Sequence, residues 1–243
     1  DAMGTPGRSK SFHDAYYGNM GDNGLPDQVA AIKQLGAQYD WMDLDRVGIY
    51  GGSGGGFAST AGILRYPDFY KVAVSGSGNH DNASYEDDWG ERYIGLESFD
   101  DDGISNYEDQ ANQVYAKNLK GKLLLIHGGM DDNVPPYNTY LVLDALIKAN
   151  KDFDFILLPN ARHGYATDNY YIMRRRWDYF VENLMQLRWQ SAIKDLHAAR
   201  DPLEEEFFEK QAEIEKEALA LYKENPNKAR EFLTKLTKER MDR

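Results

Sequence analysis

Short, uniformly apolar runs recur along the first part of the chain. Four of them are predicted to be strands: Val47–Gly52, Lys71–Ser75, Lys122–His127 and Asp152–Pro159. Stretches with helical character fall between or after these runs, at residues 26–38, 58–64, 137–149 and 170–188. Strands that are apolar throughout, rather than at alternate positions, are typical of a parallel sheet that is covered on both faces. The pattern therefore predicts an α/β fold in which helices flank a parallel sheet.

The pattern changes character after about residue 190. Residues 201–204 (Asp-Pro-Leu-Glu) combine an N-cap aspartate, a first-turn proline and a glutamate at the capping-box position. Apolar side chains then recur at helical spacing, and Asn225-Pro226 repeats the cap and the proline. We therefore predict an α/β domain over residues 1–190 and a helical extension over residues 191–243 that contains a helical hairpin.

Composition narrows the classes of function. The chain has 243 residues, no cysteine and a formal net charge of −12. The absence of cysteine excludes disulfides and thiolate metal sites. The negative charge disfavours nucleic acid and anionic membrane surfaces as partners, because their phosphates are repelled. No apolar run approaches the roughly 20 residues of a membrane-spanning helix, no cofactor or metal motif stands out, and the cellular compartment stays open.

A serine in a glycine-rich turn is the first candidate for chemistry. Residues 51–55 read Gly-Gly-Ser-Gly-Gly, which fits Gly-x-Ser-x-Gly between a predicted strand and a predicted helix. On such a turn Ser53 is exposed as a nucleophile, and the backbone N–H of Gly54 points at the developing oxyanion. A phosphate-binding turn is the competing interpretation, but neither a Gly-Lys-Ser/Thr sequence nor a dinucleotide fingerprint accompanies it.

Two further residues complete a triad in the chain order that α/β-hydrolases use. Asp131 follows the third predicted strand and His163 follows the fourth. Parallel strands bring their carboxyl ends to one edge of the sheet, where these side chains can converge with Ser53. His163 would act as the base, and Asp131 would orient it and stabilise its cation. His127 is interpreted as a structural histidine, and Asp132 is the rival for the acid.

Several separated motifs are typical of one family. They are residues 4–8 (Gly-Thr-Pro-Gly-Arg), 27–31 (Asp-Gln-Val-Ala-Ala), 51–56, 91–95 (Glu-Arg-Tyr-Ile-Gly), 127–134 (His-Gly-Gly-Met-Asp-Asp-Asn-Val) and 163–164 (His-Gly). Over roughly residues 1–187 the chain resembles the prolyl-oligopeptidase superfamily of serine peptidases, and within it the dipeptidyl peptidase IV branch. The resemblance implies an α/β-hydrolase fold, a peptide substrate, and the triad of Ser53, Asp131 and His163.

The resemblance also implies a substrate-binding region. Tyr85 and Trp89 fall where that branch places the aromatic side chains around the residue before the cleaved bond, often proline. Asn133 falls where a side chain contacts the substrate carbonyl, and Val134 falls where one forms the pocket wall. Arg92 falls beside the substrate, although an ion pair with a neighbouring acid is an equal alternative.

Departures from the family bear on activity. Gly52 and Gly54 stand where the branch carries large residues, which leaves the turn around Ser53 open. The family's first strands and β-propeller would precede this segment, so we expect the second oxyanion donor and the glutamates that bind a free amino terminus outside it. The strand at 47–52 is then expected to form an exposed edge that invites pairing with another chain. Family members are often periplasmic or secreted.

The C-terminal region has a separate resemblance. Residues 201–243 resemble, less closely, the C-terminal helices of N-terminal-nucleophile dipeptidases, whose nucleophilic cysteine is absent here. A fusion of two gene fragments and a plain helical extension are both open interpretations.

Three functions follow from these observations. The first is a serine-type peptidase that hydrolyses short peptides through a Ser-Asp-His triad and an acyl-enzyme. An esterase or acylaminoacyl hydrolase would use the same triad. The third is a catalytically impaired fragment that acts as an interaction scaffold, whose helical tail or open sheet edge binds a second copy of the chain or the missing propeller portion.

Overall fold

A computed structural model of the chain describes residues 2–22, 24–198, 205–225, 227–229, 231–232 and 234–235. The chain divides into two compact units, Asp1–Arg188 and Trp189–Arg243. The first unit contains the sheet and the second contains the C-terminal helix α7 (Glu205–Glu224). The roles expected of the two regions, a catalytic domain and a helical extension, stay predictions.

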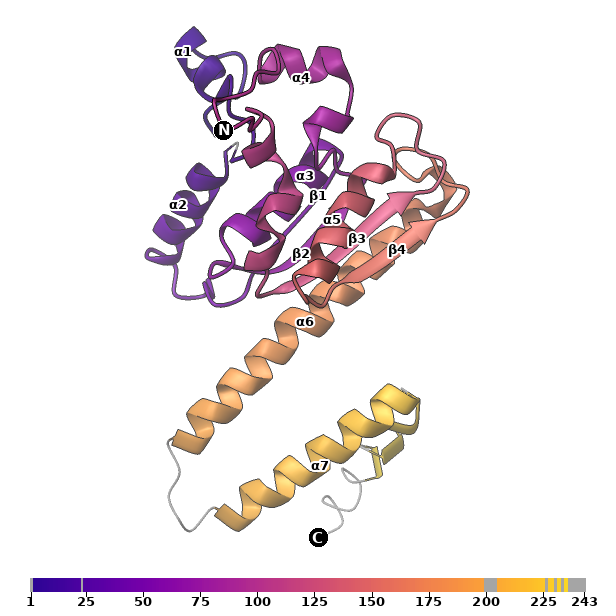
Figure 1. The fold of residues 1–243 in the computed structure, drawn as a ribbon. Helices are drawn as coiled ribbons and strands as arrows, with labels where there is room; N and C mark the ends of the chain where they lie inside the picture. Colours follow the sequence, from indigo (N-terminus) through magenta and orange to yellow (C-terminus); the bar gives the residue numbers. More distant parts are fainter. Residues whose placement is uncertain are drawn as a thin grey trace. The chain divides into compact units, whose positions relative to one another are not determined.

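Four strands form one parallel sheet in the first unit. They are β1 (Val47–Gly52), β2 (Tyr70–Gly76), β3 (Lys122–Gly128) and β4 (Asp154–Leu158), hydrogen-bonded in the order β1-β2-β3-β4. All three strand pairs are parallel, so the carboxyl ends lie at one edge of the sheet (Figure 1). The predicted α/β fold with a parallel sheet is confirmed, and each apolar run coincides with a strand.

Helices connect the strands and flank them. They are α1 (Lys10–His13), α2 (Leu25–Gly36), α3 (Gly54–Arg65), α4 (Asp87–Tyr93), α5 (Tyr137–Lys148) and α6 (Asn169–Ala198). Short 3₁₀ helices occupy Asp14–Tyr16, Asn82–Ser84, Glu108–Gln110, Asn112–Asn118 and Ala166–Asp168. α3 stops where the sequence predicts, before Tyr66-Pro67, because proline disfavours helical backbone in the residue ahead of it. It begins at Gly54, directly after Ser53, as the strand–turn–helix interpretation of the Ser53 motif expects, and ahead of the helix-forming residues 58–64.

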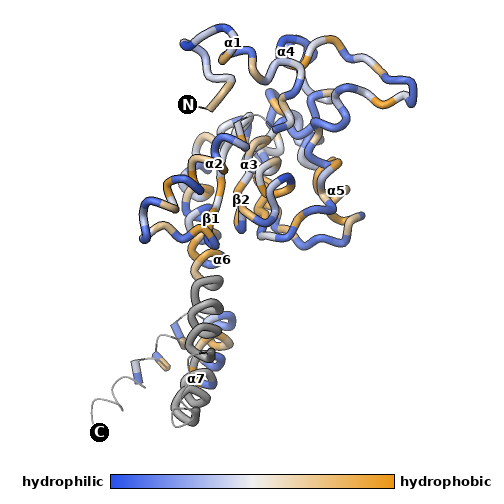
Figure 2. The backbone as a smooth tube through the Cα atoms, turned by 90° about the vertical axis from the view of Figure 1, so that its left-hand side faces the viewer, coloured by the Kyte–Doolittle hydropathy of each residue, from blue (hydrophilic) through white to orange (hydrophobic). Residues whose placement is uncertain are grey.

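The sheet is covered on both faces. Leu123 and Leu125 of β3 pack in a core with α2, α3 and α5. Leu124 and Ile126 of the same strand pack in a second core with Tyr179 of α6. A strand whose neighbouring side chains enter opposite cores must be apolar throughout, which is the pattern seen in the sequence. In Figure 2 the hydrophobic colouring gathers around β2, whereas hydrophobic and hydrophilic stretches alternate along the loop after α4.

β1 lies at one edge of the sheet. Tyr50 on this strand is 53% exposed. The guanidinium of Arg176 on α6 lies 4.2 Å from the centroid of the Tyr50 ring, and the ring of Phe180 contacts it edge-on with centroids 6.1 Å apart. Within the described part of the chain β1 pairs only with β2, so it has the free edge that the sequence predicts, and α6 packs on the Tyr50 side chain.

The second unit is helical where it is described. Residues 227–229, 231–232 and 234–235 are helical in addition to α7. The cap predicted at residues 201–204 and the proline at 226 lie outside the described residues, so the hairpin stays a prediction. No helix among the described residues combines the length and the apolar character needed to cross a membrane.

Candidate active site

Ser53 occupies the tight turn between β1 and α3. Its backbone has φ 57° and ψ −124°, a conformation that costs a non-glycine residue of order 1–3 kcal/mol and persists only where surrounding contacts impose it. One such contact is the backbone N–H of Ser53, which donates to the carbonyl of Gly76 at the end of β2 over 2.8 Å. A strained serine at a strand end presents its hydroxyl beyond the edge of the sheet.

Only some of the glycines around this turn are required by packing. A Cβ at Gly51 would overlap the carbonyl of Gly55, and a Cβ at Gly56 would overlap the carbonyl of Gly76. A Cβ at Gly54 would meet nothing within 4 Å. Gly54 is the first residue of α3, where backbone N–H groups lack a partner within the helix. The space beside the expected oxyanion donor is therefore open, and its N–H is available to a ligand.

Asp131 lies in the loop after β3 with its carboxylate buried. One carboxylate oxygen accepts the backbone N–H groups of Asn133 and Val134, each over 3.0 Å, and the other accepts from His163 Nδ1 over 2.8 Å. Burial alone would raise the pKa of Asp131. The hydrogen bond from His163 and the two from the backbone outweigh that effect and hold this pKa below its usual value.

His163 is held in one tautomer by this carboxylate. Because ionised Asp131 can only accept, Nδ1 of His163 carries the hydrogen and Nε2 is left free to accept a proton. Asp132, the rival acid, instead forms an exposed ion pair with Arg162 at 2.6 Å. No hydrogen bond joins His163 to the hydroxyl of Ser53 within the described part of the chain.

Tyr165 anchors the loop that carries His163. Residues 164–166 have φ values of 83°, 64° and 43°, which turn the Tyr165 side chain into the core. The hydroxyl of Ser77 donates to the phenol oxygen over 3.2 Å, and the phenol donates to the carbonyl of Ile126 over 3.3 Å. Burial raises the pKa of Tyr165 to about 12, so it stays protonated. Ser77 follows Gly76, whose carbonyl accepts from the backbone N–H of Ser53. Hydrogen bonds at the end of β2 therefore hold both the Ser53 turn and the His163 loop.

His127, the alternative histidine, supports the loop of Asp131. It is fully buried, with Nε2 2.9 Å from the carbonyl of Val134 and Nδ1 2.7 Å from the hydroxyl of Thr139. A carbonyl only accepts, so Nε2 carries the hydrogen and Nδ1 accepts from Thr139. Burial lowers the pKa of His127, and this neutral side chain ties the loop to β3 and α5.

Most of the expected substrate-binding residues lie together. The rings of Tyr85 and Trp89 contact edge-on with centroids 5.8 Å apart, and the Tyr85 hydroxyl donates to the side-chain carbonyl of Asn133 over 3.3 Å. Val134 is fully buried. Asn133 and Val134 belong to the same loop as the acid, because their backbone N–H groups bind Asp131. Tyr85 and Trp89 come from the segment around α4 and reach this loop through the hydrogen bond of Tyr85 to Asn133.

Arg92 contacts a different set of residues. Its guanidinium lies 5.4 Å from the centroid of the Tyr93 ring, and it forms no ion pair with a neighbouring acid within the described residues. It lines a hollow of about 350 Å³ together with Tyr16, Tyr17 and His13. Its role in substrate binding stays a prediction.

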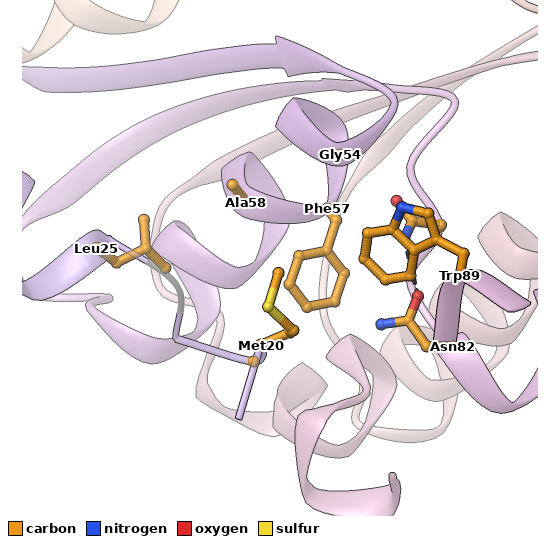
Figure 3. A pocket seen from close by; sticks show the side chains of 9 residues that line it. Met20, Leu25, Gly54, Phe57, Ala58, Asn82 and Trp89 are labelled. Atoms are coloured by element: carbon orange, nitrogen blue, oxygen red, sulfur yellow. Dashed lines mark hydrogen bonds between the residues drawn. The ribbon is translucent and has the colours of Figure 1, made fainter. Parts of the chain in front are cut away.

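A cavity of about 160 Å³ lies beside Gly54 and was missed by sequence reasoning. Its wall includes Met20, Leu25, Phe57, Asn79, Asn82 and Trp89 (Figure 3). Among these side chains, only Trp89 was expected at a pocket. The others come from segments that are far apart along the chain and share no motif, so the folded structure was needed to bring them together.

Comparison with known proteins shows the family of the chain. The model of the prolyl oligopeptidase family matches residues 1–186. Dipeptidyl peptidase 8 of Mus musculus is 33% identical over 166 residues, which are 68% of this chain and 18% of that protein. Dipeptidyl peptidase family member 1 of Caenorhabditis elegans is 34% identical over 170 residues, which are 69% of this chain and 20% of that protein.

A solved structure agrees with the sequence comparison. The crystal structure of Porphyromonas gingivalis dipeptidyl peptidase 4 matches with a TM-score of 0.69 and 28% identity over 75% of this chain and 26% of that chain. The chain spans about a fifth of the length of the curated relatives. It belongs to the prolyl oligopeptidase family and corresponds to part of the family's α/β-hydrolase catalytic domain.

Proposed function

We propose that this chain carries the catalytic centre of a serine peptidase, with Ser53 as nucleophile, His163 as base and Asp131 as acid. The observation that carries the proposal is the 2.8 Å hydrogen bond between Asp131 and His163 Nδ1, which leaves Nε2 free to accept a proton. The strained backbone at Ser53 supports the proposal. So do the hydrogen bonds at the end of β2, where Gly76 binds the Ser53 turn and Ser77 binds Tyr165 of the His163 loop.

The reaction is an acyl transfer in two stages. The hydroxyl oxygen of Ser53 bonds to the peptide carbonyl carbon while His163 Nε2 takes its proton, and the Gly54 N–H stabilises the oxyanion. The carbon–nitrogen bond then breaks, and His163 returns the proton to the leaving amine. Water, deprotonated by the same imidazole, hydrolyses the acyl-enzyme. Asp131 stabilises the imidazolium in both stages.

The side chain before the cleaved bond is assigned to the region of Tyr85 and Trp89. Their edge-on contact presents apolar ring surface beside the loop of Asp131, and aromatic faces bind apolar substrate groups well. Asn133, which accepts from the Tyr85 hydroxyl, is positioned to hydrogen-bond the substrate backbone in this scheme.

An ester hydrolase is the second candidate, because the open space at Gly54 admits bulky acyl groups. Comparing the hydrolysis of Xaa-Pro arylamides with that of aryl esters separates the two. A peptidase hydrolyses both, whereas an esterase hydrolyses only the ester.

Labelling with a fluorophosphonate tests the triad without knowledge of the substrate. The Ser53 oxygen bonds to phosphorus, fluoride leaves, and His163 takes the hydroxyl proton. We expect wild-type protein to label, and the Ser53→Ala and His163→Ala variants to remain unlabelled. Exposed Ser98→Ala and His13→Ala are matched controls that should label as wild type. Wild-type labelling in Ser53→Ala would refute the nucleophile, and a folded but unlabelled wild type would favour the interaction scaffold.

A further inference from the structure

Two asparagine side chains at the cavity beside Gly54 keep hydrogen-bonding groups free. Asn79 follows β2 and Asn82 begins a 3₁₀ helix, and their exposed fractions are only 3% and 6%. The Asn79 amide nitrogen donates to the Asn82 side-chain carbonyl over 2.8 Å. Among the described residues, the carbonyl of Asn79 and the amide nitrogen of Asn82 have no partner. Exchanging oxygen and nitrogen in both amides also leaves one free acceptor and one free donor, with the two residues exchanging these roles.

The cavity lies where a substrate side chain would enter. Gly54, which adjoins Ser53, forms part of its wall, as do Phe57 and Trp89. Figure 3 shows the carboxamide of Asn82 below Trp89, with its nitrogen directed toward the region between Phe57 and Met20. The remaining walls are apolar, so a bound side chain meets hydrocarbon along its length and an amide pair at one side.

We propose that this cavity selects a residue with a terminal carboxamide, as in glutamine, immediately before the cleaved bond. This inference rests on the serine peptidase function proposed above. A substrate carboxamide complements both free groups, because its carbonyl accepts from Asn82 and its nitrogen donates to Asn79. Its methylene stem packs against Phe57 and Trp89.

Proline, which the family resemblance implies at this position, fits the cavity less well. Its ring would displace water from the free groups of Asn79 and Asn82 without replacing the hydrogen bonds. Each buried polar group left without a partner lowers affinity about tenfold. Methionine has nearly the shape of glutamine but, like proline, cannot replace these hydrogen bonds. Comparing glutamine with methionine therefore separates the effect of hydrogen bonding from that of side-chain size.

The test measures competition with fluorophosphonate labelling of the full chain. Three N-acetylated Ala-Xaa methylcoumarin amides, with glutamine, methionine or proline before the cleaved bond, are titrated against the probe. The readout is the concentration that halves the labelling rate, which reports occupancy whether or not the peptide is cleaved. We expect the value for glutamine to be at least about tenfold below the values for methionine and proline.

Variants assign the selectivity to the amide pair. Asn82→Leu removes both the acceptor for Asn79 and the free donor without adding a charge. It should bring the glutamine and methionine values together, whereas Asn118→Leu, which lies ahead of β3 at the amino ends of the strands, should keep them apart. If the wild type labels but the glutamine and methionine peptides halve the labelling rate at equal concentrations, this inference is overturned and the proposed function stands. A wild type that never labels overturns the proposed function and this inference together.

Discussion

Acidification should destabilise the first unit through one buried histidine. His80 is fully buried, and its Nδ1 lies 3.0 Å from the side-chain nitrogen of Asn112. That nitrogen also donates to the carbonyl of Phe57 over 3.0 Å, which fixes it as a donor. Nδ1 of His80 must therefore accept, and a second proton there would face another donor. Burial, and then the charge that a protonated His127 would add, lower the pKa of His80 from 6.5 to about 3.

This shift gives the sign and the size of the effect. Between pH 6.5 and pH 3 the unfolded chain binds a proton at His80 that the folded chain does not. The free energy of unfolding therefore falls as the pH falls through 6.5, by about 1.4 kcal/mol per pH unit in the steep part. Integrated from pH 7 to pH 5, the loss from His80 is about 2 kcal/mol, a large part of the stability of a typical domain.

The assay is urea unfolding at pH 7, 6 and 5, followed by tryptophan fluorescence. Trp41, Trp89 and Trp177 lie in the first unit. His80→Gln keeps an acceptor for Asn112 and cannot titrate, so its stability should change less with pH than that of the wild type. The exposed His13→Gln should change as the wild type does. Equal pH slopes in the wild type and His80→Gln would refute the reasoning, whatever the absolute stability of the variant.

Two further substitutions probe how the active site is held. Gly56→Ala should lower the free energy of unfolding in urea by about 1–3 kcal/mol and slow fluorophosphonate labelling, because the new Cβ overlaps the carbonyl of Gly76. Gly54→Ala has open space around its Cβ and should change neither quantity. Equal losses of stability in the two variants would contradict this distinction. Tyr165→Phe should lose about 1 kcal/mol and lower the labelling rate, since its phenol joins Ser77 to the carbonyl of Ile126; an unchanged labelling rate would show that this anchor does not position the His163 loop.

The sheet was predictable because its signal is local. Each strand is apolar throughout, and the side chains of β3 enter cores on both faces. The start of α3 follows from the Ser53 motif and not from composition. Glycine has a low helix propensity, so composition indicates a helix only from residue 58, whereas the position of Ser53 between a strand and a helix indicates a start at Gly54, where α3 begins.

The candidate site also contains residues that local sequence predicts and residues that it does not. The order of Ser53, Asp131 and His163 follows from strand ends and chain order alone, and the structure brings the last two into hydrogen-bond contact. Asn79 and Asn82 carry no such signal. Nothing in their local sequence shows that they pair with each other at a cavity wall, because that arrangement depends on α4 and on residues near Met20.

Backbone strain offers an argument about function that does not depend on the family. Among the described residues, the non-glycine positions with positive φ are Ser53, Ser77, Asn150, Tyr165 and Ala166. Asn150 follows the end of α5, where asparagine adopts this conformation readily. The others all follow the carboxyl ends of strands, at the edge where the proposed triad lies. Such strain costs stability at each position and persists where other contacts impose it, so its concentration at one edge indicates a site whose geometry is maintained at the expense of the fold.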